Sequence, residues 1–206
     1  MLVDTIKKLE NLYDVTNEAL FNSELPKVVI TLQSRQGMYG YCTNKKVWTI
    51  NNEDNAYYEL NLSPEYLDRS LDEIVATIIH EQIHVYCRVH GLHEARMNYH
   101  NRIFRDLALD HLLSVGTRDQ KVGYGYTSSS TLLHNKLIEL GININKNTFN
   151  VRRMIPPIKT QHINKKKDTL RHFACLNCGL EMTTRKQGDI SLCCCTCNSM
   201  LIEFKK

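Results

Sequence analysis

Two histidines four residues apart constrain the fold of this chain more than any other feature. The sequence reads His80-Glu81-Gln82-Ile83-His84, and side chains at positions i and i+4 of an α-helix lie on one face, one turn apart. Both imidazoles can then hold one zinc ion, and the glutamate can act on a zinc-bound water. The pattern therefore predicts a helix with a catalytic zinc site on one face.

The residues around this motif support a helix. Ser70 and Glu73 have the spacing of a capping box, in which Ser70 caps the helix and Glu73 bonds back. Gly91 is of the residue type that commonly ends a helix. Between them, apolar residues recur with helical spacing at Ile74, Val75, Ile78, Ile79 and Ile83. The alternative is an ordinary amphipathic helix that carries two histidines and no metal.

A catalytic zinc usually takes three protein ligands and leaves a fourth position for water. His100 is the favoured third ligand, because it opens the next expected helix, which can fold back over the first. His90 has the ligand spacing of metzincins, but that pattern needs a glycine where this chain has Cys87. On an unbroken helix, His90 points about 120° away from His84. The remaining alternatives are His93 and Glu94.

Four cysteines near the C-terminus have the spacing of a second zinc site. Cys175, Cys178, Cys194 and Cys197 form the pattern C-x₂-C-x₁₅-C-x₂-C, which is typical of zinc ribbons. We expect this zinc to be structural, since so short a segment cannot bury a core of its own. Cys193 can replace Cys194 in a shifted register, and a disulfide cluster or redox thiols are the alternative to a metal.

Charge is distributed unevenly along the chain. Residues 1–141 carry 14 Lys and Arg against 18 Asp and Glu, a net −4, whereas residues 142–206 carry 12 against 4, a net +8. We therefore expect a catalytic domain over 1–141, a basic linker over 142–170 and a zinc ribbon over 171–206. The basic C-terminal third predicts sequence-independent DNA binding. The residues expected to contact phosphates are Arg152, Arg153, Lys165, Lys166, Lys167 and Arg171.

The remaining composition is typical of an intracellular globular protein. No apolar run approaches the roughly 20 residues that span a bilayer, and residues 1–10 lack the apolar core of a signal peptide. Six of the eight cysteines lie between Cys175 and Cys197, which favours metal binding in a reducing compartment over a disulfide framework. We expect a protein of the cytoplasm, nucleoid or nucleus that does not contact membranes.

The order of the expected elements indicates an α+β fold. Four strands are expected between the first helix and the motif helix, and further helices follow. The segment 116–131 is rich in Gly, Ser and Tyr and is expected to be a loop. The expected helices are 3–21, one from Ser70 through the motif, 99–114 and 132–140, and the expected strands are 28–32, 38–42, 46–50 and 57–62.

Several stretches of the chain match the pattern of one known family: Phe21 to Pro26, Met38 to Tyr41, Trp48, Glu59 to Asn61, His80 to His84, His100 with Phe104, and the cysteine module. Through them the chain resembles the SprT-like metallopeptidases, which include bacterial SprT and the eukaryotic Spartan proteases. Asn101 departs from the family, which usually has glycine there. The resemblance implies a compact zincin-like domain, with helices packed on a small, mostly antiparallel sheet. For Spartan it implies cleavage of proteins crosslinked to DNA.

These observations predict a zinc-dependent metalloendopeptidase associated with DNA. His80, His84 and His100 would hold the catalytic zinc, and Glu81 would act as general base on a protein substrate. The substrates would be DNA-bound or DNA-crosslinked proteins. One alternative is a nucleic-acid-binding regulator that keeps zinc without proteolysis, although such a protein does not need Glu81. Another is a peptidase whose ribbon docks only a protein partner.

Overall fold

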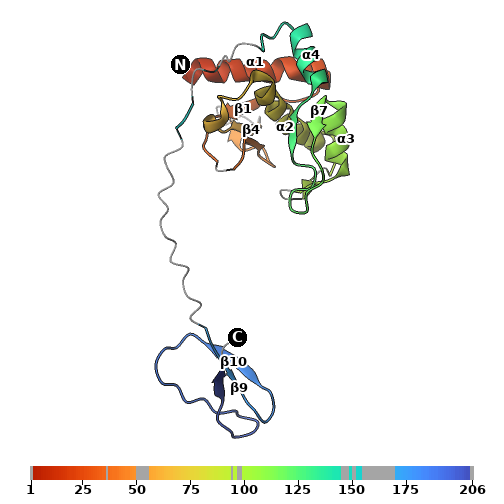
Figure 1. Ribbon diagram of the computed structural model, residues 1–206. Coiled ribbons are helices and arrows are strands. Elements are labelled where there is room, and N and C mark those ends of the chain that lie inside the picture. Colours follow the sequence, from red (N-terminus) through yellow and green to blue (C-terminus); the bar gives the residue numbers. More distant parts are fainter. Residues whose placement is uncertain are drawn as a thin grey trace. The chain divides into compact units, whose positions relative to one another are not determined.

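The computed structural model describes two compact units of the chain, Met1–Ile155 and Pro156–Lys206, which are treated separately (Figure 1). The residues that it describes are 2–35, 37–49, 56–93, 95–96 (backbone only), 99–144, 149, 152–154 and 170–204.

Within the described residues, the first unit combines four α-helices with short strands, so the expected α+β class is confirmed. The helices are α1 (Leu2–Phe21), the 3₁₀ helix η1 (Pro64–Tyr66), α2 (Leu71–Val89), α3 (Arg102–Asp110) and α4 (Thr131–Glu139). The strands are β1 (Val28–Thr31), β2 (Gly40–Cys42), β3 (Trp48–Thr49), β4 (Ala56–Leu62), β5 (Ala95–Arg96), β6 (Tyr99–His100), β7 (Leu113–Val115) and β8 (Thr127–Ser129).

The strand β4 is the centre of a small mixed sheet. It pairs in parallel with β1, and antiparallel with β2 and β3. The helix α2 contacts β2 of this sheet, and it also contacts α1, α3, α4 and the β7–β8 hairpin. Figure 1 shows α1 running along one side of the unit, with α2 next to it. The motif helix is therefore the central element of the unit.

The sequence of α2 explains this central position. Thirteen of its 19 residues are buried, so the helix needs packing partners on most of its sides. Gln82, which lies within the histidine motif, is fully buried and points at α1. Its Oε1 accepts from the Thr16 hydroxyl at 2.9 Å, and its Nε2 donates to the Tyr13 carbonyl at 2.9 Å. These bonds fix the rotation of α2, and thereby the direction of its histidine face.

The ends of α2 agree only in part with the expected signals. Gly91 ends the helix in the left-handed region at φ 66°, with the Leu92 N–H bonded to the Cys87 carbonyl at 2.7 Å. The expected capping box is absent, because the Ser70 side chain makes no capping bond. Glu73 Oε1 instead accepts from the hydroxyl and N–H of Ser129 on β8, at 2.8 and 3.1 Å. A tertiary contact has replaced the local one.

Two predictions of secondary structure after α2 were wrong. The helix expected over 99–114 is shorter: β6 occupies Tyr99–His100, and α3 begins after Asn101, whose Oδ1 accepts from the N–H groups of Ile103 and Phe104. Asn101 therefore acts as the helix N-cap. The segment expected as a loop over 116–131 contains β8, which pairs with β7 in an antiparallel hairpin.

Part of the segment that the sequence assigns to a linker packs on the first unit. Phe149 is 4% exposed and belongs to its core, and Ile142 and Ile144 pack against the same core. The described residues 170–204 form the second unit, with β9 (Arg171–Ala174) between β10 (Glu181–Thr184) and β11 (Ile202–Phe204). Its small core consists of Phe173, Cys175, Cys194 and Leu201.

Candidate metal centres

The structure brings three histidines of the first unit together. His80 and His84 from α2 and His100 from β6 offer ring nitrogens that all lie within 4.8 Å of one another. The Nε2 atoms of His84 and His100 are 3.1 Å apart. Phe104 packs against all three rings, with centroid separations between 4.4 and 5.0 Å. The favoured third residue thus lies beside the motif, with an apolar wall next to it.

The alternative third ligands lie elsewhere or are not described. His90 Nε2 pairs with the carboxylate of Glu24 at 3.0 Å, and its ring lies 4.1 Å from that of Tyr86. His93 is exposed, and its carbonyl accepts from the Asn101 side chain. Glu94 lies outside the described residues.

Hydrogen bonds set the direction of two of the imidazoles. His80 Nδ1 lies 2.8 Å from Thr127 Oγ1 on β8, and His100 Nδ1 lies 3.2 Å from the Val122 carbonyl. A carbonyl only accepts, so His100 Nδ1 carries the proton and Nε2 keeps its lone pair. The same tautomer of His80 would leave its Nε2 available. Such partners are typical of histidines that bind metals.

Two glycines that the sequence analysis assigned to a loop allow this arrangement. A Cβ on Gly123 would lie 2.0 Å from the His100 carbonyl oxygen, and one on Gly125 would lie 2.7 Å from His100 Nδ1. The backbone of this segment pairs with His100: the His100 N–H donates to Val122 O, and the Tyr124 N–H donates to His100 O, both at 3.0 Å. In the sequence, the run Gly123-Tyr124-Gly125 could have indicated this contact, since a close backbone approach needs residues without a Cβ.

Glu81 lies beside the histidines and is 5% exposed. Burial raises the pKa of its carboxyl to about 8, against the lowering effects of the Arg88 charge and of a hydrogen bond from the Cys42 N–H. Gly40 allows β2 to lie close to both α2 and β4, because a Cβ there would lie 3.1 Å from the Thr77 methyl carbon on α2 and 2.8 Å from Asn61 O on β4. The strand β2 therefore holds the Glu81 carboxylate by a backbone donor.

The electrostatics of this site suit a metal ion. Burial and the neighbouring imidazoles lower the pKa of His80 and His84 well below the ordinary value. Both rings are therefore neutral at pH 7 and able to donate a lone pair. Imidazole ligands suit zinc, copper, iron or nickel. The residues fit a metal ion, because their ring nitrogens converge at one place.

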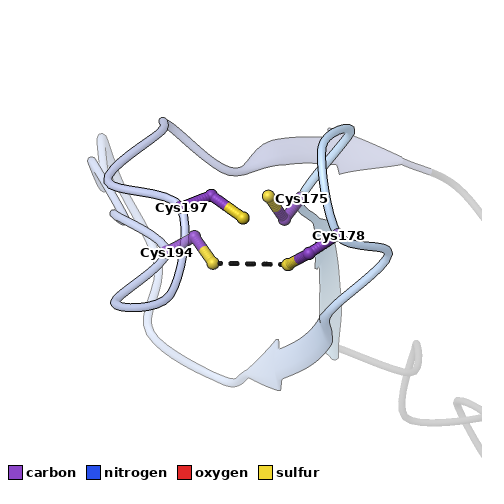
Figure 2. A group of neighbouring side chains, drawn as sticks. All are labelled: Cys175, Cys178, Cys194 and Cys197. Atoms are coloured by element: carbon purple, nitrogen blue, oxygen red, sulfur yellow. Dashed lines mark hydrogen bonds between the residues drawn. The ribbon is translucent and has the colours of Figure 1, made fainter.

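The second unit gathers four thiols. The Sγ atoms of Cys175, Cys178, Cys194 and Cys197 all lie within 4.8 Å of one another. Figure 2 shows two cysteines from each of two facing loops, with Cys178 Sγ 3.6 Å from Cys194 Sγ. Cys193 lies outside this group and is exposed. Four thiolates arranged in this way suit a closed tetrahedral site for zinc or iron.

The two loops that carry these thiols have the same backbone design. In the first, the Gly179 N–H bonds to Cys175 O at 2.8 Å, and the Cys175 N–H bonds to Leu180 O. In the second, the Asn198 N–H bonds to Cys194 O at 2.8 Å, and the Cys194 N–H bonds to Ser199 O. Gly179 and Asn198 both have positive φ, 73° and 55°. The repeated knuckle places Cys194, and not Cys193, in the group of four thiols.

The described residues among the expected phosphate contacts are all in ion pairs. Arg152 pairs with Asp68 at 2.6 Å, Arg153 lies 3.9 Å from Glu65, and Arg171 pairs with Glu203 at 2.6 Å. Lys165, Lys166 and Lys167 lie outside the described residues. DNA contact by this group stays a prediction.

Comparison with known proteins identifies one family. The model of the SprT-like family matches residues 9–112, about half of the chain, including both motif histidines and His100. An uncharacterized protein from the mucB 3′ region of Salmonella typhimurium is 46% identical over 43 residues, which are 21% of this chain and 58% of that protein. No solved structure matches the chain. Among the described helices, none has the length and apolar character needed to cross a membrane.

Proposed function

Because the chain belongs to the SprT-like family, we propose that its first unit is a zincin-like zinc metallopeptidase that cleaves protein substrates. The observation that carries this proposal is the convergence of three imidazoles, with the buried Glu81 directly after His80 in the motif helix. A site that only stores or structures a metal does not need a carboxylate there, whereas peptide hydrolysis needs a general base.

The residues of the site divide the chemistry between them. His80, His84 and His100 would hold zinc, which polarises a water molecule and lowers its pKa toward about 7. Glu81 would take a proton from the attacking water and pass it to the leaving nitrogen of the peptide. The Cys42 N–H bonds to this carboxyl group, and a cation held by the imidazoles would lower its pKa from about 8, so that it could accept the proton.

The edge of strand β2 supports the proposal that the substrate is a polypeptide. The carbonyl of Tyr39 and the N–H of Thr43 bond to Ser63 and Glu59, on the β4 side of the strand. Gly40 and Cys42 alternate with them and present their peptide groups to the other side, where the Cys42 N–H already bonds to Glu81. Within the described residues, β2 pairs only with β4. An extended peptide can add to such an edge, and its carbonyl groups would then pass Glu81.

We also propose that DNA directs this activity. The support is the net +8 of residues 142–206 and the candidate structural zinc site in the second unit. Tethering through phosphate contacts would concentrate the peptidase on DNA-bound or DNA-crosslinked proteins, without reading sequence. Such a protein would act at the nucleoid or in the nucleus.

The test is cleavage of a DNA-bound basic protein by the wild type and by Glu81→Gln, with and without DNA. Zinc content is measured for both proteins. We expect cleavage that DNA stimulates, and that Glu81→Gln abolishes while it keeps its zinc. If neither protein cleaves, and both keep two zinc ions and bind DNA tightly, the protein is a non-proteolytic nucleic-acid-binding regulator.

A further inference from the structure

A second surface of the first unit lies directly beside His100. A pocket of about 340 Å³ is lined by Tyr99, Asn101, Arg102, Arg118 and Tyr124. The first three residues flank His100 in the sequence, and the other two belong to the segment between β7 and β8 that packs on His100. The residues that line the pocket are therefore neighbours of His100, three of them in the sequence and two through the segment that packs on it.

Arginines accompany both tyrosines of this pocket. Arg118 Nε donates to the Tyr99 hydroxyl at 2.9 Å, and its guanidinium carbon lies 5.9 Å from the centroid of that ring. The guanidinium of Arg105 lies 5.2 Å from the Tyr124 ring. Both tyrosines are partly exposed. The surface thus offers two aromatic rings, each with a cation at its side.

Among the described residues, carboxylates compensate only part of the charge of this pocket. Arg105 bonds to Asp106, and the Asp119 carboxylate accepts the backbone N–H groups of Lys121 and Val122. Within the described part of the chain, neither Arg102 nor Arg118 forms an ion pair with a carboxylate. They differ in this from Arg152, Arg153 and Arg171, whose guanidinium groups already face acids.

We propose that this pocket binds a segment of single-stranded nucleic acid. Bases would stack on Tyr99 and Tyr124, while Arg102 and Arg118 would contact phosphates. A nucleic acid supplies planar groups and anions together, whereas an acidic peptide would use only the cations. The Asn101 amide already caps α3 and donates to the His93 carbonyl, so it is not available to read base edges. Binding would therefore be independent of sequence.

This contact is distinct from the one proposed for residues 142–206, and it rests on the proposed function only for its consequence. Nucleic acid bound here would lie next to the strand that carries His100, so a protein attached to it would be held at the peptidase site. Binding itself is measured without turnover, so failure of the peptidase proposal would leave this one standing, and the reverse also holds.

The experiment uses the full-length chain with Glu81→Gln as the parent and fluorescein-labelled oligothymidylate of about 15 nucleotides, a length typical of single-strand sites. Anisotropy titrations at several salt concentrations compare the parent with Arg102→Ala/Arg118→Ala. The control, Lys7→Ala/Lys8→Ala, removes the same charge from the exposed face of α1. Tyr124→Ala and Arg118→Lys test stacking and charge separately, and zinc content and thermal melting verify that each variant is folded.

We expect the arginine pair to lower the salt slope by about 1.4, since each phosphate contact to a single strand contributes about 0.7. Tyr124→Ala should weaken binding roughly fivefold or more, whereas Arg118→Lys and the α1 control should stay close to the parent. An oligonucleotide with bromodeoxyuridine should crosslink to Tyr99 or Tyr124. Three results would each overturn the proposal. They are unchanged affinity and salt slope in Arg102→Ala/Arg118→Ala, crosslinks confined to residues 152–204, and binding of an acidic peptide in place of the oligonucleotide.

Discussion

His80 Nδ1 lies 2.8 Å from the Thr127 hydroxyl, although the two residues are 47 positions apart in the sequence. The contact joins the motif helix α2 to β8, and the segment that leads into β8 also holds His100. One hairpin therefore orients candidate ligands from two different elements. Removing its contacts should change metal binding without touching a ligand.

Thr127→Val tests this directly. The substitution keeps the shape of the side chain but removes the hydroxyl that bonds to His80 Nδ1, so the imidazole loses the partner that sets its tautomer and orientation. Loss of such a partner typically costs about 10- to 100-fold in metal affinity. Zinc affinity is measured by competition with a chromogenic chelator. Thr127→Ser keeps the hydroxyl and should bind zinc like the wild type; equal affinity in all three proteins would contradict an orienting role.

Gly123→Ala tests the close approach of the backbone to His100. The new Cβ would lie 2.0 Å from the His100 carbonyl oxygen, and it would also be held at φ 65°. We expect the β7–β8 segment to move away and zinc affinity at the histidine site to fall at least tenfold, the lower end for lost orienting contacts.

Gly141→Ala is the matched control for this substitution. Gly141 has a similar φ of 73°, but no atom lies within 4 Å of its ideal Cβ. It therefore carries only the conformational cost of a left-handed residue, about 1–2 kcal/mol. If both variants lose stability equally and both keep normal zinc affinity, Gly123 serves the turn alone.

The sequence predicted best those features that are encoded over short distances. The spacing of His80 and His84 and the C-x₂-C pairs specify local geometry, and the structure gathers both sets. The hydroxyl of Thr127 and the two glycines beside His100 were missed, because contacts between distant segments leave no periodic pattern. The capping box at Ser70 failed for a related reason: Glu73 found a partner on β8.

Glu59→Gln tests a buried carboxylate that ties the sheet together. Glu59 is 7% exposed, and its Oε1 accepts from Thr31, Gln33 and Tyr41 while Oε2 accepts from the Trp48 indole N–H at 2.8 Å. A glutamine places an NH₂ group against donors on one side or the other. We expect the first unit to lose about 1–3 kcal/mol, the usual cost of an unsatisfied buried donor.

Urea unfolding followed by fluorescence measures this loss, because Trp48 is the only tryptophan of the chain and reports on the first unit alone. The control is Glu18→Gln on the exposed face of α1, where a change within about 0.5 kcal/mol is expected. An unaltered midpoint in Glu59→Gln would show that the four donors do not depend on the negative charge.

Cys178→Ser tests whether the two metal centres are independent. The thiol lies in the four-cysteine group of the second unit, and the histidine group belongs to the first. We expect zinc content to fall from two ions per chain to one, with peptidase activity on a DNA-free peptide retained, because loss of a structural zinc unfolds the segment that it holds and nothing else. Cys195→Ser changes an exposed cysteine outside the group and should keep both ions. Loss of both zinc ions in Cys178→Ser would show that the histidine site depends on a folded second unit, because the two centres would then be coupled.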